Sequence, residues 1–258
     1  MSDTDILCLQ DGAILTLQIN RLGKKNALTH AMYSQLAQAL KDADANDSVR
    51  CVIITGSPDC FTSGNDLGDF MSNPPASFEE APVAGFLYQL QDFSKPLIAA
   101  VGGIAIGIGT TLLLHCDLIY AADNTRFQMP FVNLGLCPEG GSSYLLPRLL
   151  GHPRAAELLL LGRTFSADEA LAWGLINDVA NTEETLAKAR DVALQIAAQP
   201  PAAVRLSKKL LKQSQYATLR ETLAKEGVSF FGQLQSAEAK EAFAAFAEKR
   251  RPDFSRFS

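Results

Sequence analysis

The sequence contains little concentrated positive charge. Its 23 lysines and arginines are outnumbered by 28 acidic residues, which gives a formal net charge of -5 over 258 residues. The basic tract that stands out is the short run Lys249–Arg251 near the carboxyl end. Because proteins that bind duplex nucleic acid need a basic surface, this composition predicts no nucleic-acid partner.

Cysteine and histidine are scarce and scattered. No two of the five cysteines form a Cys-x-x-Cys pair, which argues against a disulfide framework and against structural zinc. The three histidines are isolated and match no metal-binding motif, so we predict no metal site. No basic stretch followed by an apolar run is visible near Met1, so we expect no secretory signal and a reducing, cytoplasmic location. The cysteines are Cys8, Cys51, Cys60, Cys116 and Cys137.

One stretch is long enough without charge to raise the question of a membrane span. Leu97 to Leu114 contains 18 uncharged residues, but four are glycines and two are threonines. No basic flank follows it, as a membrane helix would favour. The better interpretation is a buried strand over 97–101, a glycine turn, and a buried helix that begins near Gly107. No membrane span is therefore expected.

Alternating strands and helices come first along the chain, and helices dominate the end. A hairpin is predicted around Asp11-Gly12, and Thr29 is placed to cap the first helix. Residues 68–82 are expected to form a loose loop, and one aromatic residue in the tail segment 246–249 is expected to be buried. The predicted class is α/β, with a core over residues 1–198 and a helical region over 199–258. Strands are predicted at 6–10, 13–20, 49–55, 97–101, 118–122 and 125–129, and helices at 84–93, 144–150, 154–161, 167–173, 183–198, 202–215, 219–233 and 237–249.

Glu139 is the carboxylate that stands out. It lies between Pro138 and two glycines, which predicts a turn, and Ser142 and Ser143 could cap the helix that follows near Tyr144. If the neighbouring apolar side chains surround it, the carboxyl group would ionise less readily, as a general acid/base at neutral pH requires. An exposed turn glutamate would show the same local pattern. The apolar neighbours in sequence are Phe131, Leu134, Leu136 and Leu145.

Two glycine-bearing turns could supply backbone donors. Ser63-Gly64-Asn65 follows one predicted strand, and Gly107-Ile108-Gly109 follows another and opens a helix. Two N–H groups from separate loops are what an oxyanion hole requires. Close packing of a helix against a sheet would also explain these glycines. Neither turn matches a nucleotide-binding motif.

At these same stretches the sequence resembles the crotonase superfamily, the enoyl-CoA hydratase/isomerase family. The resemblance covers nearly the whole chain. It implies a spiral of ββα units with a helical trimerisation region, a homotrimer or hexamer, and acyl-CoA thioester substrates, with no cofactor beyond the CoA of the substrate. Its markers are Asn26-Ala27-Leu28, the run Phe61 to Leu67, the run Lys95 to Val101 with Asp117, Pro138 to Ser143, Ala170 to Leu175, and Phe246 to Arg251.

The same resemblance implies roles for individual residues. The backbone N–H groups of Asn65 and Ile108 would form the oxyanion hole, and Glu139 would be catalytic. A further set is expected to bind the CoA moiety or line the substrate pocket, and two of its members, Phe230 and Lys249, are expected to reach CoA across a subunit boundary. This set is Lys24, Ala27, Ser63, Gly64, Asp66, Leu67, Gly107, Phe131, Leu134, Phe230 and Lys249.

Departures from the family pattern narrow the expected reaction. Hydratases of the family carry two glutamates, where this sequence has Thr111 and Phe131, and neither can act as a carboxylate base. Glu139 instead matches the single catalytic glutamate of the peroxisome-type Δ3,Δ2-enoyl-CoA isomerase branch. We therefore predict an enoyl-CoA isomerase that moves a 3-enoyl double bond into conjugation. The alternatives are a hydratase or ring-modifying isomerase of the same fold, and a non-catalytic acyl-CoA-binding module.

Overall fold

A six-stranded sheet forms the larger layer of the protein. The computed structural model describes residues 4–72 and 75–257. The strands of this sheet are almost entirely apolar and buried in its centre, as expected for parallel strands covered on both faces. The order is β1 (Ile6–Asp11), β2 (Ile14–Ile19), β3 (Cys51–Thr55), β5 (Leu97–Val101), β7 (Leu118–Ala122) and β10 (Asp178–Ala180).

Only the first pair of this sheet is antiparallel. β1 and β2 form the predicted hairpin around Gly12, with Asp11 paired to Ile14, and the remaining neighbours are parallel. A second sheet has the order β4 (Cys60–Thr62), β6 (Ile104–Ile106), β8 (Arg126–Gln128) and β9 (Phe165–Ser166). Each of β3, β5 and β7 is thus followed by a short strand of the second sheet. This repeat confirms the predicted α/β spiral of ββα units.

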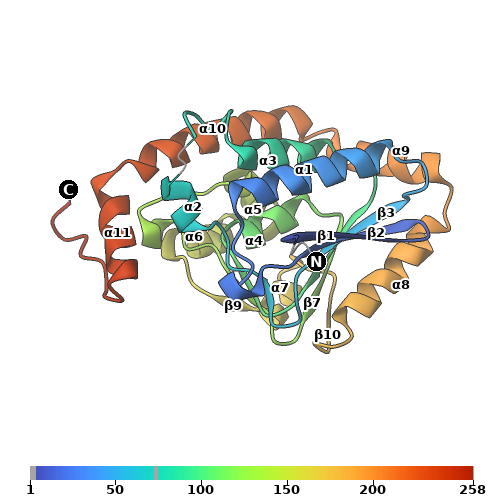
Figure 1. Ribbon diagram of the computed structural model, residues 1–258, viewed down its shortest axis with the longest axis horizontal. Coiled ribbons are helices and arrows are strands. Elements are labelled where there is room, and N and C mark those ends of the chain that lie inside the picture. The colour runs from blue at the N-terminus through green and yellow to red at the C-terminus, as the bar shows by residue number, and fades with distance from the viewer. Residues whose placement is uncertain (1–3, 73–74, 258) are drawn as a thin grey trace.

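Helices cover both faces of the larger sheet (Figure 1). α1 (His30–Ala45) and α3 (Pro82–Asp92) pack together on one face, while α8 (Thr185–Ala197) packs against β3, β5 and β7 on the other. α1 begins where predicted, because the Thr29 hydroxyl accepts a hydrogen bond of 3.3 Å from the Met32 amide. Its apolar residues recur every three or four positions and are buried.

The charge-free stretch folds as two strands and a short helix. β5 and β6 are followed by α4 (Ile108–Thr111) and the 3-10 turn η2 (Leu112–His115), so the expected strand, turn and buried helix are confirmed and β6 is an addition. Over residues 4–72 and 75–257, no helix combines the length and apolarity needed to cross a membrane. Further 3-10 turns are η1 (Leu22–Lys24) and η3 (Val132–Leu134).

The carboxyl-terminal helices differ in how they contact the rest of the chain. α10 (Tyr216–Leu234) packs against α3 and α5 (Ser142–Leu150), so it contributes directly to the core, while α11 (Ala237–Ala247) lies at the end that carries the carboxyl terminus (Figure 1). The division between residues 198 and 199 stays a prediction. The other helices are α2 (Leu67–Ser72), α6 (His152–Leu161), α7 (Ala167–Ala172) and α9 (Pro201–Lys212).

Three local predictions are wrong. Residues 68–82 do not begin as a loop, because α2 occupies 67–72 and the Asp66 carboxylate accepts a hydrogen bond from the Asp69 amide. The serines 142 and 143 do not cap α5, which begins at Ser142 with Gly141 in a left-handed conformation before it. Phe246 is 69% exposed rather than buried.

Candidate active site

The two glycine-bearing turns meet at one edge of the smaller sheet. β4 and β6 are parallel neighbours, so the turns at their carboxyl ends lie side by side. A Cβ on Gly64 would lie 2.9 Å from the Ile106 carbonyl oxygen, and one on Gly109 would lie 2.6 Å from the Thr62 methyl group. Such contacts are too close for any side chain, so glycine permits the approach. Close packing therefore explains these glycines, and the oxyanion hole stays a prediction.

Each turn presents a backbone N–H group. Around Asn65, the Leu28 amide donates to the Gly64 carbonyl and the Asp66 amide donates to the Leu28 carbonyl, which leaves the Asn65 amide between two pairs. Ile108 is the first residue of α4, where amides have no partner inside the helix. Within the described ranges, neither amide has a protein acceptor. These two donors suit a carbonyl oxygen that gains negative charge.

Glu139 lies beside these turns and is buried, with 7% of its surface exposed. Its Oε1 accepts a hydrogen bond of 2.5 Å from the Thr111 hydroxyl, one turn along α4 from Ile108. Gly140 permits this contact, because a Cβ there would lie 2.7 Å from the Thr111 oxygen and its φ is +67°. Burial raises the pKa of Glu139 to about 8, the Thr111 hydrogen bond opposes this, and the charge of Glu226 adds to it.

A second buried carboxylate, Glu226 of α10, holds the Glu139 turn. It accepts hydrogen bonds of 2.6 Å from the Gly141 amide and 2.9 Å from the Ser143 amide, and so caps α5 from another helix. Burial raises the pKa of Glu226, although these hydrogen bonds favour its ionised form. Glu226 was not among the residues predicted from the sequence. The feature that could have identified it is a single acidic residue among the buried positions of α10, which are Leu219, Leu223, Glu226, Gly227 and Phe230.

His115 forms a hydrogen bond with the same turn. Its Nε2 donates a hydrogen bond of 2.8 Å to the Gly140 carbonyl. Burial lowers the pKa of His115 to about 4, so the ring is neutral at physiological pH. It is a buried residue with a structural role.

A pocket brings the candidate residues together. Asn65, Glu139 and Gly140 supply its polar part, and the remaining wall comes from α2, α3, α10 and the segment before α3. Of the predicted pocket residues Phe230 lines it, whereas Phe131 and Leu134 do not; Phe131 packs behind Phe230, with ring centroids 6.4 Å apart. The apolar lining is Phe70, Phe78, Val83, Leu87, Leu223, Gly227, Phe230 and Phe231.

The predicted CoA contacts lie around the first turn or on the surface. Lys24 and Lys249 are exposed, at the end of η1 and just after α11. Asp66 forms an ion pair of 2.7 Å with Arg21; burial opposes ionisation of Asp66, but this pairing lowers its pKa. The described residues contain no cluster suited to a metal ion. Of the rest of the set, Ser63 and Gly64 follow β4, Gly107 follows β6, and Leu67 begins α2. Ala27 lies between η1 and α1, next to Leu28, which pairs with Asn65.

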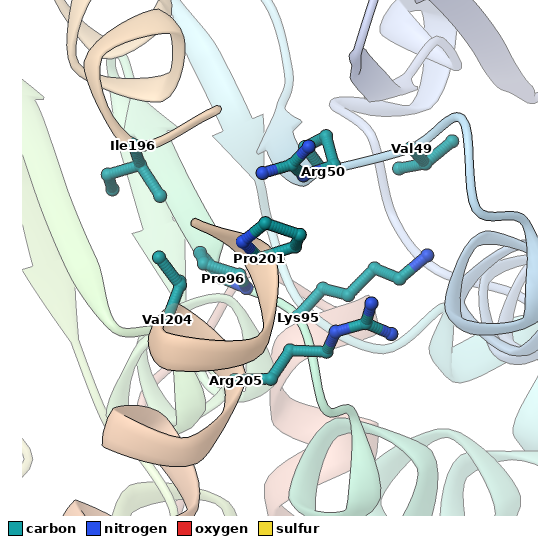
Figure 2. Close-up of a pocket in the computed structure, with 8 residues that line it drawn as sticks. All are labelled: Val49, Arg50, Lys95, Pro96, Ile196, Pro201, Val204 and Arg205. Carbon is teal, nitrogen blue, oxygen red and sulfur yellow. The ribbon is translucent and has the colours of Figure 1, made fainter. Parts of the chain in front are cut away.

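Another pocket, at the junction of α8 and α9, has a structural explanation (Figure 2). Lys95 is buried there and donates hydrogen bonds of 2.7 Å to the Ala43 and Asn46 carbonyls at the end of α1. Arg50 donates one of 2.6 Å to the Gln199 carbonyl. Arg50 therefore ties the α8–α9 junction to the start of β3, and Lys95 ties the end of α1 to the start of β5. None of the residues shown in Figure 2 lines the pocket of Glu139.

Comparison with known proteins decides the family. The model of the enoyl-CoA hydratase/isomerase family matches residues 10–256, nearly the whole chain. The chain belongs to this family. It is an enoyl-CoA hydratase/isomerase family enzyme with the crotonase fold that the sequence predicted.

Relatives within the enoyl-CoA hydratase/isomerase family carry out different reactions. The chain is 34% identical to the 2,3-dehydroadipyl-CoA hydratase of Escherichia coli K12, over 97% of this chain and 98% of the relative. It is 37% identical to the enoyl-CoA delta isomerase 2 of Rattus norvegicus, over 95% of this chain but 64% of that longer protein. Among solved structures, Pseudomonas aeruginosa OdaA is 51% identical with a TM-score of 0.91, over 94% of this chain and 98% of OdaA.

Proposed function

We propose that this enzyme isomerises a 3-enoyl-CoA to the conjugated 2-enoyl-CoA with one carboxylate as both base and acid. The observation that carries the proposal is the composition of the pocket. Of the described residues that line it, Glu139 alone is ionisable, and Thr111 occupies the nearby position on α4 where the family's hydratases have a glutamate. A shift of a double bond needs one group that takes and returns a proton, whereas addition of water needs further groups to hold and activate the water.

The proposed reaction proceeds through a dienolate. Glu139 removes a proton from C2, and the electron pair moves through C1 onto the thioester oxygen. The Asn65 and Ile108 N–H groups donate to this oxygen and stabilise its charge. The carboxylic acid of Glu139 then returns the proton at C4, the C3–C4 double bond becomes a single bond, and the C2–C3 double bond forms. No atom is gained or lost.

The electrostatics of Glu139 support this role. A pKa of about 8 keeps the carboxyl group near the balance between base and acid at neutral pH. The Thr111 hydroxyl orients one carboxylate oxygen and leaves the other for the substrate. The apolar wall excludes water, which strengthens hydrogen bonds from the two amides to the substrate oxygen.

The remaining parts of the proposal follow the family. CoA would bind along the first turn, near Lys24, Ala27, Ser63 and Asp66, with no separate cofactor. Lys249, which is exposed, would contact CoA from a neighbouring subunit of a homotrimer or a hexamer.

The test uses two substrates and two variants. Wild-type enzyme mixed with a 3-enoyl-CoA should increase the ultraviolet absorbance of the conjugated thioester, and a 2-enoyl-CoA should lose none. Glu139→Gln should abolish the increase while calorimetry still detects binding of a saturated acyl-CoA, and Glu183→Gln in the exposed turn before α8 should behave as wild type. Loss of the 2-enoyl absorbance would instead establish a hydratase. Turnover by Glu139→Gln would refute the assignment of the base.

A further inference from the structure

The wall of the substrate pocket is almost entirely apolar. Apart from Asn65, Glu139 and Gly140, its described lining consists of phenylalanine, leucine and valine side chains and one glycine. No lysine, arginine or histidine is among these lining residues. Most of the apolar side chains are themselves buried, including Leu87 and Leu223 at 1% exposure. An acyl chain in this pocket would therefore contact hydrocarbon and aromatic surface.

This wall discriminates against a charged acyl group. A carboxylate at the far end of an acyl chain would lose its water and gain no cation or hydrogen-bond donor from the apolar wall. The ionisable residue in this lining, Glu139, carries charge of the same sign once it is ionised, and Glu226 lies behind it. Both effects disfavour an acyl group that ends in a carboxylate.

One residue of the wall, Phe78, is closely packed on several sides. Phe78, from the segment between α2 and α3, lies directly on Gly227 of α10, where an added Cβ would be 2.2 Å from the phenyl ring. The ring is also edge-on to Tyr88 and to Phe231, with centroids 6.2 Å and 6.0 Å away. Any larger residue at position 227 would collide with Phe78, so glycine is needed there. The Phe78 ring closes the pocket between α3 and α10.

We propose that this pocket selects uncharged, apolar acyl chains, and that Phe78 seated on Gly227 limits the length of chain that it accepts. The proposal rests on the proposed function in that it takes this pocket to be the acyl site. It concerns which acyl-CoA binds, whatever reaction follows. Binding measurements with saturated thioesters can therefore test it even if isomerisation is not observed.

The first experiment compares two ligands of equal chain length. Hexanoyl-CoA and adipyl-CoA differ in the terminal carboxylate, and isothermal titration calorimetry at pH 7 gives a Kd for each. We expect adipyl-CoA to bind about 100-fold more weakly, because an unpaired buried charge is strongly unfavourable. Equal affinities would overturn the selection against charge. Tight binding of hexanoyl-CoA without any isomerase activity would leave the selectivity intact and refute only the proposed reaction.

The second experiment enlarges the pocket by shortening the side chain at position 78. Kd is measured for saturated acyl-CoAs of increasing chain length with wild-type enzyme, Phe78→Leu and Phe78→Ala. We expect affinity to rise with chain length and then to fall, and the turning point to move to longer chains in both variants. Phe246→Ala, which removes an exposed phenyl group outside the pocket, should keep the wild-type turning point. Thermal unfolding establishes that each variant is folded, and an unchanged turning point in a folded Phe78→Leu would overturn the role of Phe78.

Discussion

The hydrogen bond between Thr111 and Glu139 offers the sharpest test of the site. Thr111 is fully buried and Glu139 nearly so, and the hydroxyl donates to Oε1 across 2.5 Å. Replacement of Thr111 by valine preserves the shape of the side chain and removes the donor. The ionised form of Glu139 loses a partner, whereas the protonated form loses much less. The pKa of Glu139 should therefore rise above its value of about 8.

The size of this rise follows from the strength of such bonds. A hydrogen bond to a charged group contributes about 1.5–3 kcal/mol, and one pKa unit corresponds to about 1.4 kcal/mol. Thr111→Val should therefore raise the pKa of Glu139 by about one to two units. Screening by solvent reduces this little, because both side chains are buried. At pH 7 the fraction of ionised base, and with it the rate, should fall by about 10- to 100-fold.

The assay is the pH dependence of kcat/KM with a 3-enoyl-CoA, which reports ionisations of the free enzyme. In the wild type the rate should rise with pH to a midpoint near 8. In Thr111→Val the midpoint should lie higher, while Thr111→Ser, which keeps the hydroxyl, should retain the wild-type midpoint. A uniform loss of rate with no change in midpoint would refute the reasoning, since the hydroxyl would then orient the carboxylate without tuning its ionisation.

Other variants test neighbouring parts of the site. Glu226→Gln should move the same midpoint downward, because it removes a negative charge that raises the pKa of Glu139, and an upward shift would contradict the Coulombic coupling. Glu139→Gln should flatten the pH dependence of stability in urea unfolding. The carboxyl pKa is raised from 4.5 to about 8 on folding, so its contribution is fully present below 4.5 and is lost as pH rises through 8, by at most about 5 kcal/mol. Gly140→Ala should reduce both activity and stability, the latter by about 1–3 kcal/mol, because its Cβ would collide with Thr111 at a positive φ. Wild-type melting behaviour of Gly140→Ala would show that the turn can relax.

Local patterns were sufficient to predict much of the scaffold. The hairpin at Gly12, the cap at Thr29 and the strand over 97–101 were each predicted correctly, because each is specified by residues close together in the sequence. The strand β6 was missed since three residues carry too little periodicity to be recognised. The helix α2 was missed because prolines and acids further along made the whole of 68–82 resemble a loop, although Phe70 at its centre is buried.

The cap of α5 could not be predicted from its own neighbourhood. Ser142 and Ser143 have the residue type that local rules favour for a cap, but the groups that accept from this turn belong to Glu226, more than 80 residues later in the sequence. Likewise, the apolar surroundings of Glu139 were expected from the residues beside it in sequence, and they come instead largely from α2, α3 and α10. Tertiary contacts between distant segments determine both features.

The two buried carboxylates, Glu139 and Glu226, have different roles because their hydrogen-bond partners differ. Glu226 accepts hydrogen bonds from two backbone N–H groups; burial raises its pKa, but these bonds favour the ionised form and hold the turn. Burial raises the pKa of Glu139 to about 8; its one hydroxyl donor, Thr111, opposes this rise, and the nearby charge of Glu226 adds to it. A group that exchanges protons with a substrate needs this near-balance, whereas a group that positions a turn needs the opposite. The environments thus separate the two glutamates into a proton carrier and a fixed anchor, and the opposite midpoint shifts expected for Thr111→Val and Glu226→Gln test that separation directly.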